Sequence, residues 1–253
     1  MLVEERHQSI INQLNTEGSV KVKDLSVFFK VTEDCIRKDL AHLEKQNLLK
    51  RTYGGAVLPR QNIHSFEVVK RKVSNIEAKE AIARKALGLI NQGDTVFLDI
   101  STANIELAKL ILQSGKRVTV VTNMIEVIQI YSAASAGSLI SVGGTLNPYG
   151  DGFEGSFCID NISRFKFDLS FLGAVGIDVF ENSVSTYDVA DGLTKSAVIK
   201  SSRKAYLITA SDKFNQDGSF RYSGIGDLTG IVTDKQPNPK IVQALSEYNV
   251  ELY

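Results

Sequence analysis

From residue 95 onward, short apolar runs alternate with segments of helical period. We interpret the runs as strands, with the sequences TVFLDI, VTVVTN, SLISVGG, FDLSFLGAVGID, KAYLITAS and TGIVTD. The predicted helices between or after them are ANIELAKLILQS, MIEVIQIYSAA, residues 191–202 and residues 239–248. Because these strands are apolar without interruption, both faces of their sheet must be covered. The alternation predicts an α/β domain with a mostly parallel sheet. A capping-box spacing, Ser74-Asn75-Ile76-Glu77, predicts one more helix, to about Asn91.

The first 57 residues follow a different pattern. Three helices are predicted, at residues 3–15, at residues 21–29 and from Thr32 as N-cap to about Gln46. After them, LLKRTYGGAVL has the pattern of two short strands hinged at Gly54-Gly55. Three helices with a short second-to-third turn, then a hairpin, are the order of an all-α winged helix-turn-helix.

The third helix separates an apolar stripe from a polar face. At about 100° per residue, Ile36, Leu40 and Leu43 share the stripe, and cations lie opposite it. A helix that buries one stripe against its own domain offers the other face to a major groove. Our candidate DNA-binding residues are those of this face and of the hairpin: Thr32, Asp34, Arg37, Lys38, Ala41, Lys45, Lys50, Arg51 and Tyr53. We therefore divide the chain into a DNA-binding domain at 1–57, a linker at 58–73 and an α/β domain at 74–253, whose expected roles in effector sensing and oligomerisation rest on the observations below.

Composition excludes several classes of protein. The chain has 253 residues, of which 43% are hydrophobic and 23% charged, as in ordinary globular proteins. Its apolar runs are far too short to span a bilayer, and its first residues have no secretory pattern. Cys35 and Cys158 form no Cys/His cluster, so we expect no metal, no cofactor, no membrane association and a cytoplasmic location. Net charge is zero, but residues 1–60 hold ten Lys/Arg and eight Asp/Glu.

Small and polar residues follow several strands of the larger domain. In an open α/β sheet, ligands bind outside the carboxyl ends of the strands. Ser101 and Thr102 precede a helix, so hydroxyls and free N–H groups meet there and favour a phosphate, with Lys195 and Lys213 as sources of positive charge. Our candidate effector-binding residues are Asp99, Ser101, Thr102, Asn123, Gly143, Gly144, Asp191, Lys195 and Lys213.

The chain resembles the DeoR family of bacterial transcription regulators. Residues 6–57 carry its N-terminal signature, including the core IRKDL…LE…L.RTYGGAV, and VFLD, VVTN, VGGTL, FLGAVGID, Lys195, SDKF and IVTD match its sensor domain. The resemblance implies a helix that reads operator DNA. It also implies a sensor, similar in fold to ribose-phosphate isomerases and glucosamine-phosphate deaminases, that binds a phosphorylated sugar. The chain departs from the family at Ile100, Ser101, Ala103, Asp191-Gly192 and Ala210.

We therefore expect a sequence-specific transcription regulator and not an enzyme. It is predicted to repress a carbohydrate catabolic operon, to respond to a phosphorylated sugar or polyol and to form a dimer or tetramer. One alternative is an isomerase- or deaminase-like enzyme with an accessory DNA-binding domain, whose candidate bases are Asp99, Asp178, Asp188 and Asp191. Another is a constitutive DNA-binding protein whose sensor only holds an oligomer together.

Overall fold

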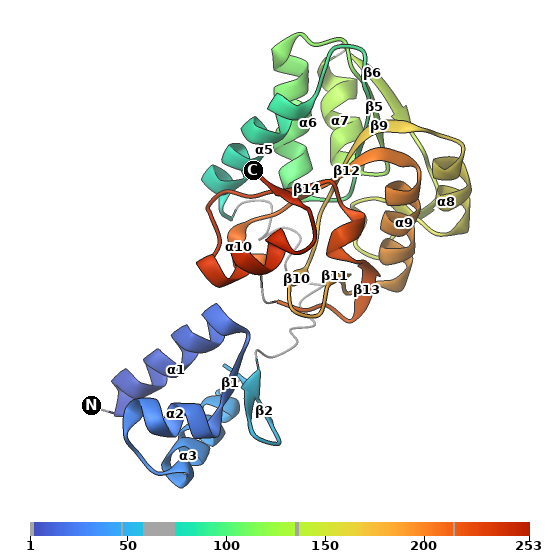
Figure 1. Cartoon of the computed structure of the whole chain (residues 1–253). Coiled ribbons are helices and arrows are strands. Elements are labelled where there is room, and N and C mark those ends of the chain that lie inside the picture. Colours follow the sequence, from blue (N-terminus) through green and yellow to red (C-terminus); the bar gives the residue numbers. More distant parts are fainter. Residues whose placement is uncertain (1–2, 47, 58–73, 135–136, 215) are drawn as a thin grey trace. The chain divides into compact units, whose positions relative to one another are not determined.

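A computed structural model describes residues 3–46, 48–57, 74–134, 137–214 and 216–253. The chain forms two compact units, Met1–Gln61 and Asn62–Tyr253, which appear in blue to cyan and in teal to red in Figure 1. The predicted linker at 58–73 lies outside the described residues. No helix in the described ranges is long and apolar enough to cross a membrane.

The N-terminal unit holds three helices and a small sheet. Its elements are α1 (Val3–Glu17), β1 (Ser19–Lys21), α2 (Val22–Phe29), α3 (Glu33–Lys45), β2 (Lys50–Thr52) and β3 (Gly55–Val57). The predicted helices and hairpin are present, and Thr32 caps α3 by accepting from the N–H of Cys35 at 3.3 Å. The sequence did not reveal β1, which pairs antiparallel with β3 to give the order β1-β3-β2. The unit is therefore not all-α, because the wing is a three-stranded sheet.

Gly55 allows the backbones of β3 and β1 to approach closely in this sheet. A Cβ at Gly55 would lie 1.8 Å from the carbonyl oxygen of Val20 on β1. Only a residue without a side chain allows the two backbones to approach so closely. The second glycine of the Gly54-Gly55 pair is thus required by the packing of β3 on β1.

The C-terminal unit is built on seven parallel strands. They are β4 (Thr95–Leu98), β5 (Thr119–Thr122), β6 (Ser138–Ser141), β9 (Phe167–Leu172), β12 (Ser202–Ile208), β14 (Gly230–Val232) and β15 (Glu251–Leu252). Their order is β15-β14-β12-β9-β4-β5-β6, and every neighbouring pair is parallel. The chain runs outward from β4 to β6 and then returns to β9 on the other side of β4. The strand order therefore reverses between β4 and β9.

Helices cover both faces of this sheet (Figure 1). One face packs against α5 (Ile76–Leu89), α6 (Thr102–Ser114) and α7 (Ile125–Ala134), and the other against α8 (Ser156–Ser163), α9 (Val189–Lys200) and α10 (Pro239–Ser246). Alternate residues of a strand supply the two cores, so that Val96 and Leu98 belong to one and Phe97 to the other. The predicted α/β architecture is confirmed.

Two local expectations were wrong. The capping box at Ser74 does not form, because Asn75, the N-cap of α5, has a left-handed backbone (φ 52°) and makes no side-chain cap. The predicted strand at residues 167–178 is broken after Leu172, and its second part, β10 (Gly176–Asp178), joins an antiparallel sheet with β11 (Ser183–Thr186) and β13 (Phe220–Ser223). A second small sheet, β7 (Thr145–Leu146) with β8 (Phe153–Glu154), occupies the loop before α8.

Candidate functional site

The polar face of α3 is exposed as predicted. Ile36, Leu40 and Leu43 are buried in the core of the N-terminal unit, whereas Asp34, Arg37, Lys38 and Lys45 are exposed and Ala41 is half-buried. On the wing, Lys50, Arg51 and Tyr53 are exposed. Tyr53 is as open as a residue in an unfolded chain, at 111%. A fully exposed aromatic ring has no role in the core and is available to a partner.

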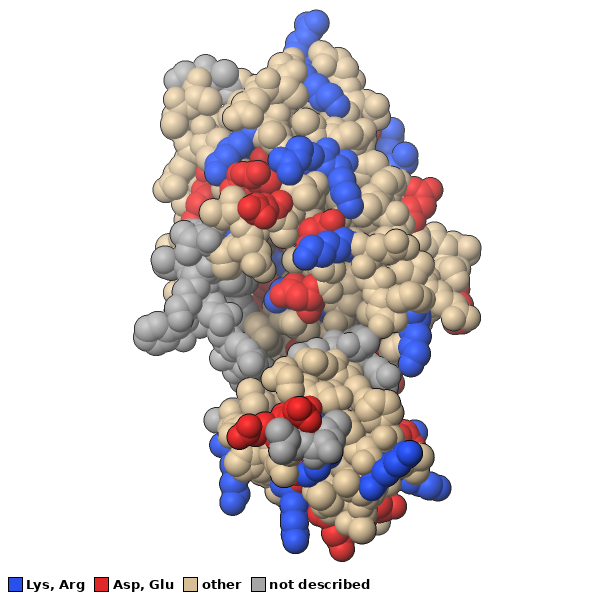
Figure 2. Space-filling model, turned by 90° about the vertical axis from the view of Figure 1, so that its left-hand side faces the viewer, with Lys and Arg blue, Asp and Glu red and all other residues tan. Residues whose placement is uncertain are grey.

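Two arginines on this face and on the wing already form ion pairs with neighbouring acids. Arg37 forms ion pairs with Glu33 and Asp34, both at 2.7 Å, and Arg51 pairs with Glu44 at 2.8 Å. On the side of the N-terminal unit that Figure 2 shows, Lys and Arg also stand among Asp and Glu. Exposed pairs of this kind are weak, so a phosphate can replace the carboxylate at little cost.

Sequence reasoning missed a buried ion pair that holds α3 in place. Asp39 is 6% exposed, and its Oδ2 accepts from Arg6 Nε at 2.6 Å. Its Oδ1 accepts from Arg6 Nη2 at 3.1 Å and lies 3.0 Å from His7 Nε2. Arg6 and His7 belong to α1, so the pair joins α1 to α3. The sequence contained a signal for this pair, because Asp39 is an acid on the same side of α3 as the buried residues Ile36 and Leu40.

The larger unit has a cavity where the strand order reverses. Its volume is about 450 Å³. Ser101 and Thr102 line it after β4, Gly173 lines it after β9, and Thr209 lines it after β12. This is the carboxyl edge of a parallel sheet at its switch point, where α/β proteins bind their ligands.

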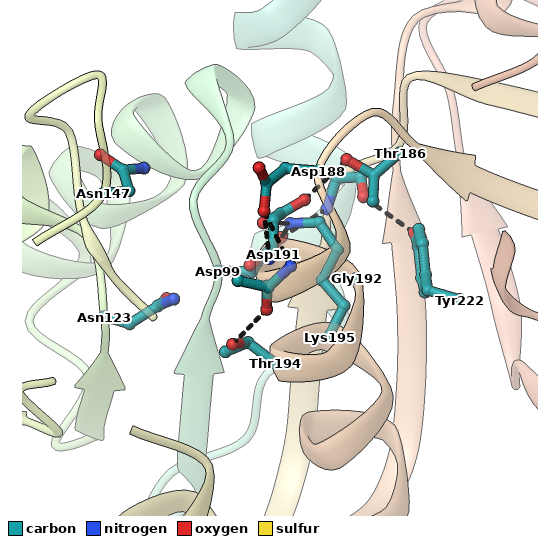
Figure 3. A network of polar contacts seen from close by, with 12 residues as sticks. Asp99, Asn123, Asn147, Thr186, Asp188, Asp191, Gly192, Thr194, Lys195 and Tyr222 are labelled. Atoms are coloured by element: carbon teal, nitrogen blue, oxygen red, sulfur yellow. Dashed lines mark hydrogen bonds and ion pairs between the residues drawn. The ribbon is translucent and has the colours of Figure 1, made fainter. Parts of the chain in front are cut away.

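A buried ion-pair network forms the floor of this region (Figure 3). Lys195 Nζ, on α9, lies 2.5 Å from Asp99 Oδ2 and 2.9 Å from Asp191 Oδ1. The same Asp99 oxygen accepts from the N–H of Gly173 at 3.0 Å and so links the ends of β4 and β9. Burial lowers the pKa of Lys195, but the carboxylates of Asp191 and Asp99 more than offset this and raise it, so the lysine stays protonated.

This network changes the expected role of Lys195. The two carboxylates already neutralise its charge, and its side chain is only 4% exposed. A phosphate placed against it would gain little net attraction, because it would face Asp99 and Asp191 as well. Lys195 lines the cavity, but its main interaction is with the carboxylates of Asp99 and Asp191, to which it is the counter-ion.

The start of α6 gives the cavity backbone donors without a side-chain cap, and two further cations line it. The N-cap of α6, Ser101, makes no side-chain cap, so the first N–H groups of this 13-residue helix lack that partner. Lys79 of α5 and Lys213 also line the cavity. Lys79 donates to the carbonyl of Ser74 at 2.6 Å, and Lys213 lies 3.6 Å from Asp212.

The wall on the side of α8 and α9 is acidic. Asp151, Glu154, Asp188 and Asp191 line it, and Asp151 and Glu154 are each 8% exposed. Asp151 accepts from the amide of Asn147 at 2.6 Å, and Asp188 caps α9. Burial, together with the nearby carboxylates of Asp188, Asp191 and Asp151, raises the pKa of Glu154 to about 7. Of these acids, only Asp191 was among the predicted effector-binding residues.

The predicted effector-binding residues do not all meet at the cavity. Five of them line it: Ser101, Thr102, Asp191, Lys195 and Lys213. Asp99 forms an ion pair with Lys195. Asn123, Gly143 and Gly144 do not line it. Asn123 is fully buried and donates to the carbonyl of Phe153 at 2.9 Å. A Cβ at Gly144 would lie 2.7 Å from Cβ of Cys158, so this glycine serves the packing of α8.

Within the described ranges, the structure contains no group of three or more His, Cys, Asp or Glu side chains arranged to hold a metal ion. The candidate bases of the enzyme alternative are also engaged. Asp99 and Asp191 pair with Lys195, Asp188 caps α9, and Asp178 accepts from the N–H groups of Phe180 and Glu181.

Comparisons with known proteins cover both units. The model of the DeoR-like helix-turn-helix domain matches residues 6–62, and that of the DeoR C terminal sensor domain matches residues 74–235. The chain is 32% identical to the glycerol-3-phosphate regulon repressor of Escherichia coli (strain K12), over 98% of this chain and 97% of the relative. It is 28% identical to the lactose phosphotransferase system repressor of Lactococcus lactis subsp. lactis, over 98% and 97%. Among solved structures, ribose 5 phosphate isomerase A from Neisseria gonorrhoeae matches with a TM-score of 0.40 and 13% identity, over 54% of this chain and 52% of that one.

Proposed function

The chain belongs to the DeoR family of transcription regulators, and from this premise we propose that it is a repressor controlled by a small phosphorylated sugar or polyol. The effector binds in the cavity between the ends of β4 and β9. The observation that carries this proposal is the start of α6, where N–H groups without a side-chain cap open onto the cavity beside Ser101 and Thr102. A helix N-terminus with adjacent hydroxyls favours a phosphate dianion.

The phosphate takes its positive charge from Lys79 and Lys213 instead of Lys195. Both lysines line the cavity, and the acid near Lys213, Asp212, is exposed and 3.6 Å away. The hydroxyls of the effector are then directed toward the acidic wall, where carboxylates and the amide of Asn147 act as acceptors and donor. The names of two relatives, a glycerol-3-phosphate regulon repressor and a lactose phosphotransferase system repressor, support this class of operon.

Operator recognition is assigned to α3 and the wing. Lys38, Lys45 and Lys50 are exposed and reach phosphates, whereas the fork of Arg37 suits a base edge once it releases Glu33 and Asp34. Tyr53 packs on the sugar-phosphate backbone from the wing. Because one unit offers only a small basic surface, two or more copies held by the sensor are needed for useful affinity. We therefore propose a dimer or tetramer, which sedimentation velocity at micromolar concentration tests.

The test of the proposed function is release of DNA by phosphorylated compounds only. The operator is first located by mapping the sites that the protein occupies in the genome. Fluorescence anisotropy then follows the full chain on this operator while sugar and polyol phosphates are added, each beside its unphosphorylated parent. We expect at least one phosphate to change operator affinity and every parent to be inert, because a ligand must bind the two states unequally to regulate.

Two variants locate the phosphate. Lys213→Met and Lys79→Met should each weaken the active phosphate by about 10- to 150-fold, the value of one charge-assisted contact. Lys204→Met removes the same charge from an exposed residue in the first half of β12, away from the carboxyl edge, and should change nothing. A panel in which no phosphate acts contradicts the proposal and favours a constitutive DNA-binding protein. Turnover of a sugar phosphate by the chain favours the enzyme alternative.

A further inference from the structure

The cavity carries opposite charges on opposite walls. On the side of α5 and α6, Lys79, Ser101 and Thr102 favour an anion. Next to α8 and at the start of α9, Glu154 and Asp188 present carboxylates, and Asp151 lies near Glu154. A phosphate complements only the side of the cavity near α5 and α6 and leaves the carboxylates without a positive partner.

The acidic wall has more negative charge than its own lysine can neutralise. Asp151, Asp188 and Asp191 lie near Glu154. Among the described residues, the ion pairs of Lys195 are with Asp99 and Asp191. Asp151 and Asp188 have amide or backbone N–H donors, which are neutral. Buried carboxylates near one another are costly to ionise unless a cation joins them.

Glu154 is the member of this wall that lacks a partner. Its residue is 8% exposed and lines the cavity. In the described part of the chain, no hydrogen bond or ion pair reaches its carboxylate. Its pKa of about 7 reflects burial and the three neighbouring acids. A carboxylate that makes no bond within the described chain and opens onto a cavity is available to a donor group of a ligand.

We propose that the effector is zwitterionic, with a phosphate at the α6 end and a protonated amine against Glu154, Asp151 and Asp188. This inference rests on the proposed function and deepens it by naming the second charged group of the ligand. An ammonium supplies both the N–H donors that Glu154 lacks and the charge that the wall lacks. A hydroxyl supplies a donor but no charge, so it satisfies the wall less well.

The test compares matched phosphates that differ only by amine and hydroxyl. Isothermal titration calorimetry of the full chain at pH 7 uses glycerol 3-phosphate beside serinol phosphate, and glucose 6-phosphate beside glucosamine 6-phosphate. Within the pair whose size fits, we expect the amine to bind about 10- to 100-fold more tightly, as charge-assisted bonds to a buried acid allow. Binding of the amine also ionises Glu154, so about half a proton is released, measured as a dependence of the enthalpy on the buffer.

The matched variants are Glu154→Gln and Glu181→Gln. Glu154→Gln keeps the shape and removes the charge, so the preference for the amine should fall several-fold and the proton release should vanish. Glu181 is exposed in the turn after β10, outside the residues that line the cavity, and its variant should keep the wild-type preference. If the wild-type chain binds the hydroxyl compound as tightly as the amine, the inference is overturned while the proposed function stands. If none of the four compounds binds, the proposed function fails for these sizes, and the inference fails with it.

Discussion

Replacing Lys195 with methionine tests whether its first role is that of a counter-ion. Methionine fills the space of the lysine stem but leaves Asp99 and Asp191 without an ammonium. The side chain of Asp99 is 1% exposed and that of Asp191 16%, so water replaces the lost contacts poorly. Removing one partner of a buried ion pair costs about 3–5 kcal/mol. Because two carboxylates are stranded here, we expect about 4 kcal/mol of lost stability at pH 8.

The loss should shrink as the pH falls. Burial raises the pKa of Asp99 even in the wild-type chain, and without Lys195 this effect grows. An acid whose pKa is raised by folding contributes stability below its unfolded pKa, and this stability is lost as the pH rises through the folded pKa. The variant should therefore recover about 1–2 kcal/mol between pH 8 and pH 5 as its buried carboxylates take up protons.

Urea unfolding followed by far-ultraviolet circular dichroism measures this, since the chain has no tryptophan. The matched control is Lys213→Met, whose side chain is 33% exposed and lies 3.6 Å from its acid. It should change stability by no more than about 0.5 kcal/mol. A Lys195→Met variant that loses less than about 1 kcal/mol at pH 8, or whose loss does not depend on pH, would refute the account of Lys195 as a buried counter-ion.

Three further predictions concern other parts of the chain. Glu154→Gln should remove a pH dependence of stability. Because the pKa of Glu154 is raised to about 7, the free energy of unfolding of the wild-type chain should fall by on the order of 2–3 kcal/mol between pH 5 and pH 8. Urea unfolding measures this, and an equal slope in both proteins would contradict it. Gly55→Ala should destabilise the N-terminal unit by about 2 kcal/mol, because its Cβ meets Val20, whereas Gly54→Ala, with no atom within 4 Å of its Cβ, should be tolerated sterically; equal melting temperatures would argue against the close approach. Lys38→Ala should lower operator affinity and reduce the salt slope by about 1 without a change in melting temperature; an unchanged slope would exclude a phosphate contact at this position.

The sequence predicted the parts of the fold that depend on a long periodic pattern. The stripe of Ile36, Leu40 and Leu43 and the apolar strands from β4 to β14 repeat one signal over many residues, so a single exception does not hide it. The strand β1 has three residues and alternates only once, and the hairpin β7–β8 has two residues on each side. Such short elements form because a neighbouring strand pairs with them, which the local sequence does not record.

The candidate site was predicted where it follows the strand ends and missed where it depends on packing between distant segments. Ser101 and Thr102 were found because they directly follow an apolar strand. Lys79 was missed because it lies on a helix whose start reaches the cavity only in three dimensions. Glu154 was missed because it comes from a small hairpin, and nothing in the local sequence indicates that folding brings it near Asp188, which was named only as a candidate base. Lys195 was expected to bring positive charge to the effector. Its pairing with Asp191, four residues earlier on α9, follows from helical spacing, whereas its pairing with Asp99, 96 residues away, does not.

The reversal of strand order also determines when the sensor is able to fold during synthesis, and the DNA-binding unit does not depend on it. The N-terminal sheet is complete once Val57 pairs with Ser19, a short distance along the chain. The sensor sheet begins at its centre, where Val96 pairs with Leu169, so its middle strand waits for β9 and its edge strand β15 is made last. Contacts that are distant in sequence form more slowly than local ones. A nascent or truncated chain therefore presents a folded DNA-binding unit before the sensor can hold two copies together, so on the proposed function incomplete synthesis yields a unit without control and without the affinity of the oligomer.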